Sequence, residues 1–176
     1  MTKEAVEREA RALVEQLGIT GERDGAWRRL NELGPGVRHA VLEGLGRANW
    51  EVRRWCALWF DRHPDPEALE AMKPLLRDPK SQVRMFALHT LACDRCKPGE
   101  GASDVVPLLI ERIRQDESIR VRRHAVMMLA FQHAHADLEG FFKQLLDTET
   151  DAKLHKHAGF GWMFCREKAG KDPLRG

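Results

Sequence analysis

Two cysteines and two histidines in the middle of the chain are the residues best suited to metal chemistry. Cys93 and Cys96 have the C-x2-C spacing of zinc ligands, and His89 precedes Cys93 by about one helical turn. His133 lies at the corresponding end of a later helix, where helices packed side by side are about 8–10 Å apart. One C-x2-C pair is a weak metal signal by itself. The sequence therefore favours a plain loop with no cofactor, and a zinc site formed by these four residues is the alternative.

Aromatic and acidic residues near position 55 suggest a second kind of chemistry. Trp50 and Trp55 could stack on a cationic nucleic-acid base, and the carboxylate of Asp61 could support cleavage at the sugar carbon. Packing also explains Trp55, because Trp59 follows it by four residues and would share its helix face. No convincing catalytic set emerges. We therefore expect a protein without enzymatic activity and keep a nucleic-acid site at Trp50, Trp55 and Asp61 as an alternative.

The composition limits the possible partners and the cellular setting. The 176 residues contain 29 Lys and Arg against 27 Asp and Glu, and the net charge of +2 provides no bulk attraction for nucleic acids or anionic membranes. No stretch approaches the ~20 apolar residues of a membrane-spanning helix, and glutamates interrupt any leader-like apolar run near the start. We expect the four cysteines to be thiols in a reducing, cytoplasmic setting, with Cys56 buried and inert.

The elements that position these residues are predicted by a repeated phrase. Its best copy begins at Val121 and runs Val-Arg-x-x-Ala-x-x-x-Leu, with apolar positions four residues apart, which places them on one face of a helix. Further copies begin at Val52 and Val83, and a weaker one begins at Leu154. The intervals of 31, 38 and 33 residues between copies are typical of a repeat protein rather than of a single closed core.

The chain is predicted to form one α-helical domain over residues 1–176. Two capping helices would occupy residues 1–33, because a terminal repeat must present one polar flank to water. Four helix pairs follow over 34–167, and the polar residues 168–176 are expected to fray. About five antiparallel helix pairs result, with no strand-like alternation between them.

Caps and interruptions define where these helices begin and end. Thr2, Asp24 and Asn49 precede apolar periodic stretches and are expected to act as N-caps. The segment Cys93–Ser103 is the one long interruption, and it accounts for the 38-residue interval between two copies of the phrase.

The alternation of an outer helix, an aspartate turn and the valine–arginine phrase resembles the HEAT repeat over roughly residues 34–165. The closest resemblance is to the short bacterial, armadillo-like form, which also occurs in phycobilisome-lyase-type proteins. It implies an all-α, right-handed α–α superhelix. It also implies a ladder of turn aspartates, Asp78 and Asp116, with the arginines of the phrase. Two positions depart from the pattern: Arg47 replaces a turn aspartate, and His155 replaces an arginine.

In this architecture the inner helices line a concave face, and their exposed positions predict a binding surface. The second and sixth positions after the first residue of each copy, here called the anchor residue, carry mainly basic and apolar side chains. An ordinary solvent-exposed helix face carries Glu, Lys and Gln instead. The predicted partner-binding residues are Arg54, Leu58, Met85, His89, Arg123, Met127, Lys156 and Phe160. If the sixth position instead turns inward, these residues belong to the core.

The resulting hypothesis is a scaffold module that presents this concave face to a protein or peptide. One alternative is a DNA-binding protein similar to the HEAT-like alkylpurine DNA glycosylases. The other is a lyase-like subunit that handles a metal or chromophore through cysteine. This alternative is inferred only from the kinds of protein in which similar repeats occur. Nucleic acid is not favoured, and no membrane partner is expected.

Overall fold

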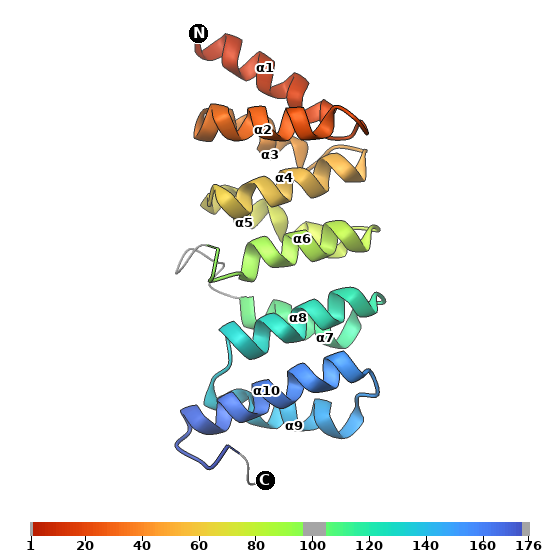
Figure 1. Ribbon diagram of the computed structural model, residues 1–176, viewed down its shortest axis with the longest axis vertical. Coiled ribbons are helices and arrows are strands. Elements are labelled where there is room, and N and C mark those ends of the chain that lie inside the picture. The colour runs from red at the N-terminus through yellow and green to blue at the C-terminus, as the bar shows by residue number, and fades with distance from the viewer. Residues whose placement is uncertain (1, 97–104, 174–176) are drawn as a thin grey trace. The chain divides into compact units, whose positions relative to one another are not determined.

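The computed structural model describes residues 2–96 and 105–173, and every regular element in these residues is a helix (Figure 1). The α-helices are α1 (Lys3–Gln16), α2 (Arg23–Leu33), α3 (Arg38–Gly44), α4 (Trp50–Arg62), α5 (Pro66–Met72), α6 (Ser81–Ala92), α7 (Val105–Gln115), α8 (Ile119–Gln132), α9 (Glu139–Thr148) and α10 (Ala152–Lys168). Three short 3-10 helices are η1 (Gly34–Val37), η2 (Pro74–Arg77) and η3 (Ala136–Leu138). The predicted all-α class is confirmed.

Contacts divide the described residues into two units. Unit 1 contains residues 2–91 and Cys96, and unit 2 contains Ala92–Arg95 and residues 105–173. The predicted interruption lies outside the described residues from position 97 onward, as do Asp104 and the last three residues of the tail. The single domain over the whole chain stays a prediction.

Unit 1 begins with α1, which packs against α2, α3 and α4. Helix α4 is tied to α6 by a buried hydrogen bond, because the Thr90 hydroxyl donates to the carbonyl of Ala57 at 2.9 Å. The backbone of α3 approaches α4 closely at Gly44, where an added Cβ would lie 2.3 Å from the Cys56 sulfur. A side chain at position 44 would therefore displace the core of this unit.

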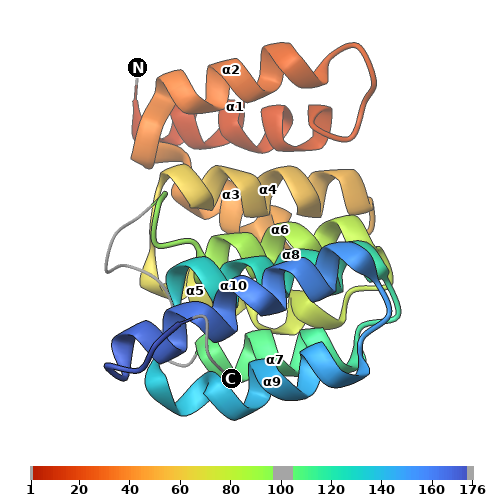
Figure 2. The same ribbon diagram turned by 60° about the horizontal axis from the view of Figure 1, so that its bottom comes forward.

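Unit 2 consists of two packed helix pairs, α7 with α8 and α9 with α10. Helices α8 and α10 lie side by side in both views of the chain (Figures 1 and 2). At the α9–α10 contact, Gly161 faces the ring of the buried Phe142. These neighbouring inner helices form the surface described below.

The repeated phrase supplies the core, as its spacing predicts. All its apolar positions that the sequence singles out are buried: Val52, Cys56, Phe60, Val83, Ala87, Leu91, Val121, Ala125, Leu129, Leu154 and Ala158. Burial also raises the pKa of the Cys56 thiol well above its usual range, so little reactive thiolate forms. The prediction that Cys56 is buried is confirmed.

Two of the three predicted N-caps are confirmed and one is wrong. The Thr2 hydroxyl accepts from the Ala5 amide at 3.3 Å, and the Asn49 side chain accepts from the Glu51 amide at 3.0 Å. Helix α2 instead begins at Arg23, before Asp24, and its N-cap residue makes no side-chain hydrogen bond. Helical hydrogen bonding starts early here because the Arg23 amide already donates to the Ile19 carbonyl.

The described part of the predicted tail contacts the last helix pair. The Arg166 guanidinium donates to the Asp172 carbonyl at 2.9 Å, and the Lys171 ammonium lies 2.6 Å from the Glu139 carboxylate. Among the described residues, no helix combines the length and apolar character that crossing a membrane requires.

Candidate functional site

The arginine–aspartate ladder connects consecutive repeats within unit 1. Arg53 donates from Nε and Nη2 to the two carboxylate oxygens of Asp78, at 2.7 and 3.0 Å. Its Nη1 donates to the carbonyls of Arg47 and Ala48. The planar guanidinium thus holds two turns at once. Because all these contacts serve packing, Arg53 is a structural residue.

Unit 2 contains a variant of the same connection. Arg122 pairs with Glu149, and its Nε donates to the Ile113 carbonyl at 2.9 Å. Glu149 thus pairs with Arg122 in unit 2 as Asp78 pairs with Arg53 in unit 1. The guanidinium groups of Arg53 and Arg122 are therefore both engaged within the fold.

A cluster of aromatic side chains, here called the aromatic patch, covers the ends of α8 and α10. Its members are Phe131, His157, Phe160 and Phe164. The Phe131 ring centroid lies 5.4 Å from that of Phe160, 5.7 Å from that of Phe164 and 5.9 Å from that of His157. Phe131 nevertheless remains 49% exposed. An aromatic ring held this way presents a fixed apolar surface to solvent.

A hollow adjoins the aromatic patch, and positive charge lies beside it. The hollow has a volume of about 450 Å³. Its lining residues are Ala130, Phe131, Ala134, Phe164, Glu167 and Lys168. The exposed Lys156 places its ammonium 5.9 Å from the centroid of the Phe160 ring. The site thus combines an apolar recess beside Phe131 and Phe164 with a cation beside Phe160, at the other end of the aromatic patch.

The eight residues predicted to bind a partner lie at the edges of the core. Seven are half-buried and one, Lys156, is exposed. Arg54, Leu58, Met85 and His89 belong to unit 1, and Arg123, Met127, Lys156 and Phe160 belong to unit 2. None of them is fully buried, so the inner-helix surface stays a prediction for all eight.

Phe131, His157 and Phe164 were not among the residues predicted to bind a partner, although a signal for the two phenylalanines was present. Phe131 follows Met127 by four residues, and Phe164 follows Phe160 by four residues. Each therefore lies one turn further along the same helix face. Extending the count from the anchor residues by one more turn would have found both.

Asp151 fixes the start of α10 near the aromatic patch. Its carboxylate accepts from the Leu154 amide at 3.0 Å and from Arg123 Nε at 2.9 Å. The bond from Arg123 is the main cause that holds the pKa of Asp151 well below its usual range, and the helix amide adds to it. The ionised form is therefore favoured in the folded protein.

This geometry predicts an acid-dependent loss of stability. A carboxyl group whose pKa is lower in the folded state stabilises the protein above its unfolded pKa of about 3.9. That contribution disappears as the pH falls toward the folded value. We expect Asp151→Asn to lower the urea midpoint at neutral pH, and the difference from wild type to shrink below about pH 4. Urea unfolding followed by circular dichroism checks this, and a difference that stays constant with pH would contradict it. Asparagine retains the cap but loses one of the two oxygens that accept from Arg123, so the ion pair rather than the cap is tested.

The residues of the nucleic-acid alternative are dispersed along α4. Trp55 packs against Trp27 with ring centroids 5.0 Å apart, and the Arg54 guanidinium lies 4.9 Å from the Trp55 ring. Asp61 is buried, with Oδ2 3.5 Å from His89 Nε2. Eleven residues separate Trp50 from Asp61, which is about 16 Å along a helix. Trp50 and Asp61 therefore lie too far apart to contact one base together.

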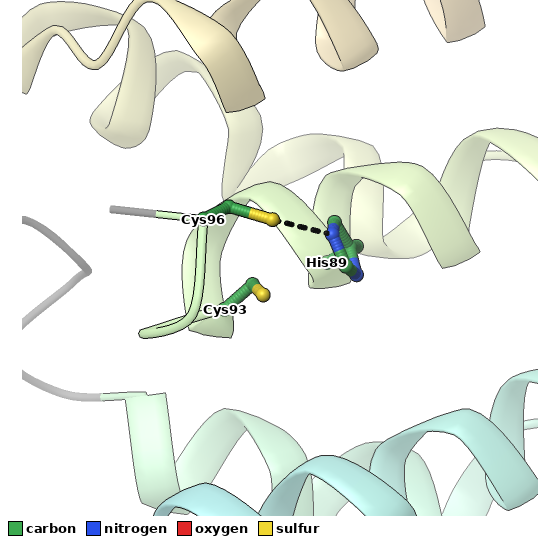
Figure 3. A group of neighbouring side chains, drawn as sticks. All are labelled: His89, Cys93 and Cys96. Atoms are coloured by element: carbon green, nitrogen blue, oxygen red, sulfur yellow. Dashed lines mark hydrogen bonds between the residues drawn. The ribbon is translucent and has the colours of Figure 1, made fainter. Parts of the chain in front are cut away.

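Three of the four predicted metal ligands converge at the end of α6. One ligand atom from each of His89, Cys93 and Cys96 lies within 4.8 Å of the others. The Cys96 sulfur and the His89 ring point toward each other across the turn that follows the helix (Figure 3). His133 lies outside this group, because its Nε2 lies 2.7 Å from the Ala92 carbonyl. The cluster thus has two thiols and one imidazole.

Within each unit the described helices pack against one another around an apolar core, which is typical of an α-helical repeat protein. Comparison with known families agrees: the family described as HEAT repeats matches residues 38–102. This match supports the resemblance to HEAT repeats that was drawn from the valine–arginine phrase.

Comparison with solved structures supports the same fold. The chain is similar to a crystal structure of an engineered protein from the Northeast Structural Genomics Consortium, with a TM-score of 0.53 and 19% sequence identity. The match covers 97% of this chain and 91% of that one. This likeness confirms the predicted helical solenoid and concerns the fold alone. No curated protein matches the sequence.

Proposed function

We propose that the chain is a non-catalytic scaffold module that binds a helix of a partner protein at the aromatic patch. HEAT repeats generally mediate protein interactions. The observation that carries the proposal is Phe131, a half-exposed ring supported by three other aromatic side chains. Large aromatic residues that are pre-ordered by packing contribute most to the affinity of protein interfaces.

The chemistry of the surface favours an amphipathic helix with acidic residues beside its apolar face. One apolar side chain of such a helix fits the hollow next to Phe131. An acidic side chain about two helical turns further along would meet Lys156, which lies eight residues before Phe164 on α10 and places its ammonium beside the Phe160 ring. Arg123 is already paired with Asp151, so Lys156 is the more available cation. A cytoplasmic setting, as expected from the cysteines, belongs to the same proposal.

Several observations favour a protein partner over a nucleic acid. The net charge of +2 supplies little attraction for phosphates, and Arg53 and Arg122 are engaged within the fold. The carboxylate of Asp61, needed by a base-excising enzyme, is buried next to His89. The proposal therefore rests on the apolar character of the patch.

Photo-crosslinking from two matched positions identifies the partner. A benzoyl-phenylalanine at position 131 retains an aromatic ring, and the same residue at position 19 serves as the control. Ile19 is 47% exposed, close to the 49% of Phe131, and belongs to unit 1. We expect position 131 alone to capture a defined protein from native lysate, and crosslinks to nucleic acid or equal capture from both positions would contradict this.

Affinity for the purified partner then tests the site quantitatively. We expect Phe131→Ala to weaken binding about 30-fold, since a central aromatic contact is worth about 2 kcal/mol. Ile19→Ala should leave the dissociation constant unchanged. Lys156→Glu should weaken binding more than Lys156→Ala, because it places like charges together. Titration calorimetry measures these constants, and equal affinities for Phe131→Ala and wild type would reject the proposal.

A further inference from the structure

We infer that His89, Cys93 and Cys96 bind one thiophilic metal ion, with Zn²⁺ as the best-suited ion. This inference is independent of the proposed docking function. The sequence spacing alone favours a plain loop, but the structure brings an imidazole nitrogen and two sulfurs within 4.8 Å of one another. Thiolate and imidazole ligands together select zinc and similar soft ions over magnesium or calcium.

The local backbone explains why the three side chains meet. His89 and Cys93 are four residues apart, the spacing that places side chains on one helix face. Helix α6 ends at Ala92, and the turn that follows returns Cys96 toward its last helical turn (Figure 3). All three ligands thus come from eight consecutive residues, and the site needs no distant part of the chain.

The observed distance fits a tetrahedral ion. Zinc binds sulfur at about 2.3 Å and imidazole nitrogen at about 2.0–2.1 Å, so tetrahedral ligands of these types lie about 3.6 Å apart. The Cys96 sulfur lies 3.4 Å from His89 Nε2. Little movement of these two side chains would therefore be required to hold an ion.

The surroundings favour positive charge and allow entry from solvent. Asp61 Oδ2 lies 3.5 Å from His89 Nε2, which adds a negative charge beside the cluster. Cys93 is buried, whereas Cys96 is exposed. An ion can therefore enter beside Cys96. On binding, each thiol loses one proton to solvent as its sulfur–metal bond forms, and the neutral imidazole donates its lone pair.

Cobalt binding to the full chain tests the inference directly. The protein is reduced with a phosphine, stripped with a chelator and titrated with Co²⁺, then with Zn²⁺. We expect a sulfur-to-cobalt charge-transfer band that saturates at one ion per chain and disappears when Zn²⁺ displaces Co²⁺. A titration without this band, or saturation only at many ions per chain, would overturn the inference.

Two ligand variants and one control variant test the assignment of His89 and Cys96. Cys96→Ser and His89→Gln should each weaken Co²⁺ binding on the order of 100-fold, since even outer-shell changes cost about 10–100-fold. Cys56→Ala is the matched control, because it removes a thiol elsewhere and introduces the residue that other repeats have at that position. It should bind Co²⁺ like wild type.

Two further outcomes are decisive. Circular dichroism establishes that Cys96→Ser, altered at an exposed position, retains its helices. An unchanged charge-transfer band in this folded variant would overturn the site. A Cys93–Cys96 disulfide that persists in the reducing buffer, detected by mass spectrometry, would do the same.

Discussion

Replacing Asp78 by alanine should lower the free energy of unfolding by about 3–5 kcal/mol, the usual cost of removing one partner of a buried ion pair. The Asp78 side chain is only 4% exposed and that of Arg53 only 12%. Without the carboxylate, the Arg53 Nε and Nη2 groups lose their acceptors. The Lys80 amide, which donates to Asp78 Oδ1 at 2.8 Å, loses its acceptor as well. An uncompensated cation then remains at the junction of two repeats.

A matched surface pair separates this effect from loss of charge in general. Glu43 pairs with Arg11 in the same unit, but both side chains are about half exposed. Glu43→Ala should cost only about 0.2–1 kcal/mol. Urea unfolding monitored by far-ultraviolet circular dichroism measures both variants. Equal losses for Asp78→Ala and Glu43→Ala would show that the buried pair has no special role. A double-mutant cycle with Arg53→Ala then isolates their coupling energy.

Adding a single methyl group at Gly161 should destabilise unit 2 by about 1–3 kcal/mol through overpacking. A Cβ there would lie 2.3, 2.4 and 2.7 Å from three ring carbons of Phe142, well inside contact distance. Phe142 is fully buried, so its ring has no open space to move into. Helix propensity acts in the opposite direction, since alanine is about 1 kcal/mol better than glycine inside a helix.

Gly159 offers the matched control two residues earlier on the same helix. Its added Cβ would meet only Leu146 at 3.9 Å, an ordinary contact. Gly159→Ala should therefore stabilise by up to about 1 kcal/mol, and the two variants should differ by about 2–4 kcal/mol. Denaturant unfolding curves give the comparison. If Gly161→Ala proves as stable as Gly159→Ala, the close contact with Phe142 does not exist in solution.

The sequence predicted the helices and their buried faces because both follow from local periodicity. A valine, an alanine and a leucine at four-residue intervals can share only one face of a helix. The contact between Arg53 and Asp78 was also foreseeable, since the resemblance to HEAT repeats implies such a ladder. These features depend on spacing along the chain, which the sequence states directly.

The details of the candidate sites depend on geometry that periodicity does not contain. The position of Phe131 on its helix face follows from the spacing, but its exposure depends on how much of α8 the neighbouring α10 covers. The approach of Cys96 to His89 depends on the direction of the turn after α6, which no residue in that turn specifies alone. The Asp24 cap was wrong because α2 begins at Arg23. The sequence thus predicted which residues share a helix face better than it predicted where helices end and how the turns between them run.

The ion pair between Arg53 and the following turn limits how repeats can be gained or lost in such chains. Arg53 belongs to one copy of the phrase, and Asp78 lies 25 residues later in the turn before the next copy. Duplication or excision of a complete copy leaves Arg53 facing a carboxylate of the following turn. A break placed between positions 53 and 78 leaves the largely buried Arg53 guanidinium without its carboxylate partner. Viable length variants of this architecture should therefore differ by whole copies and not by fractions of one.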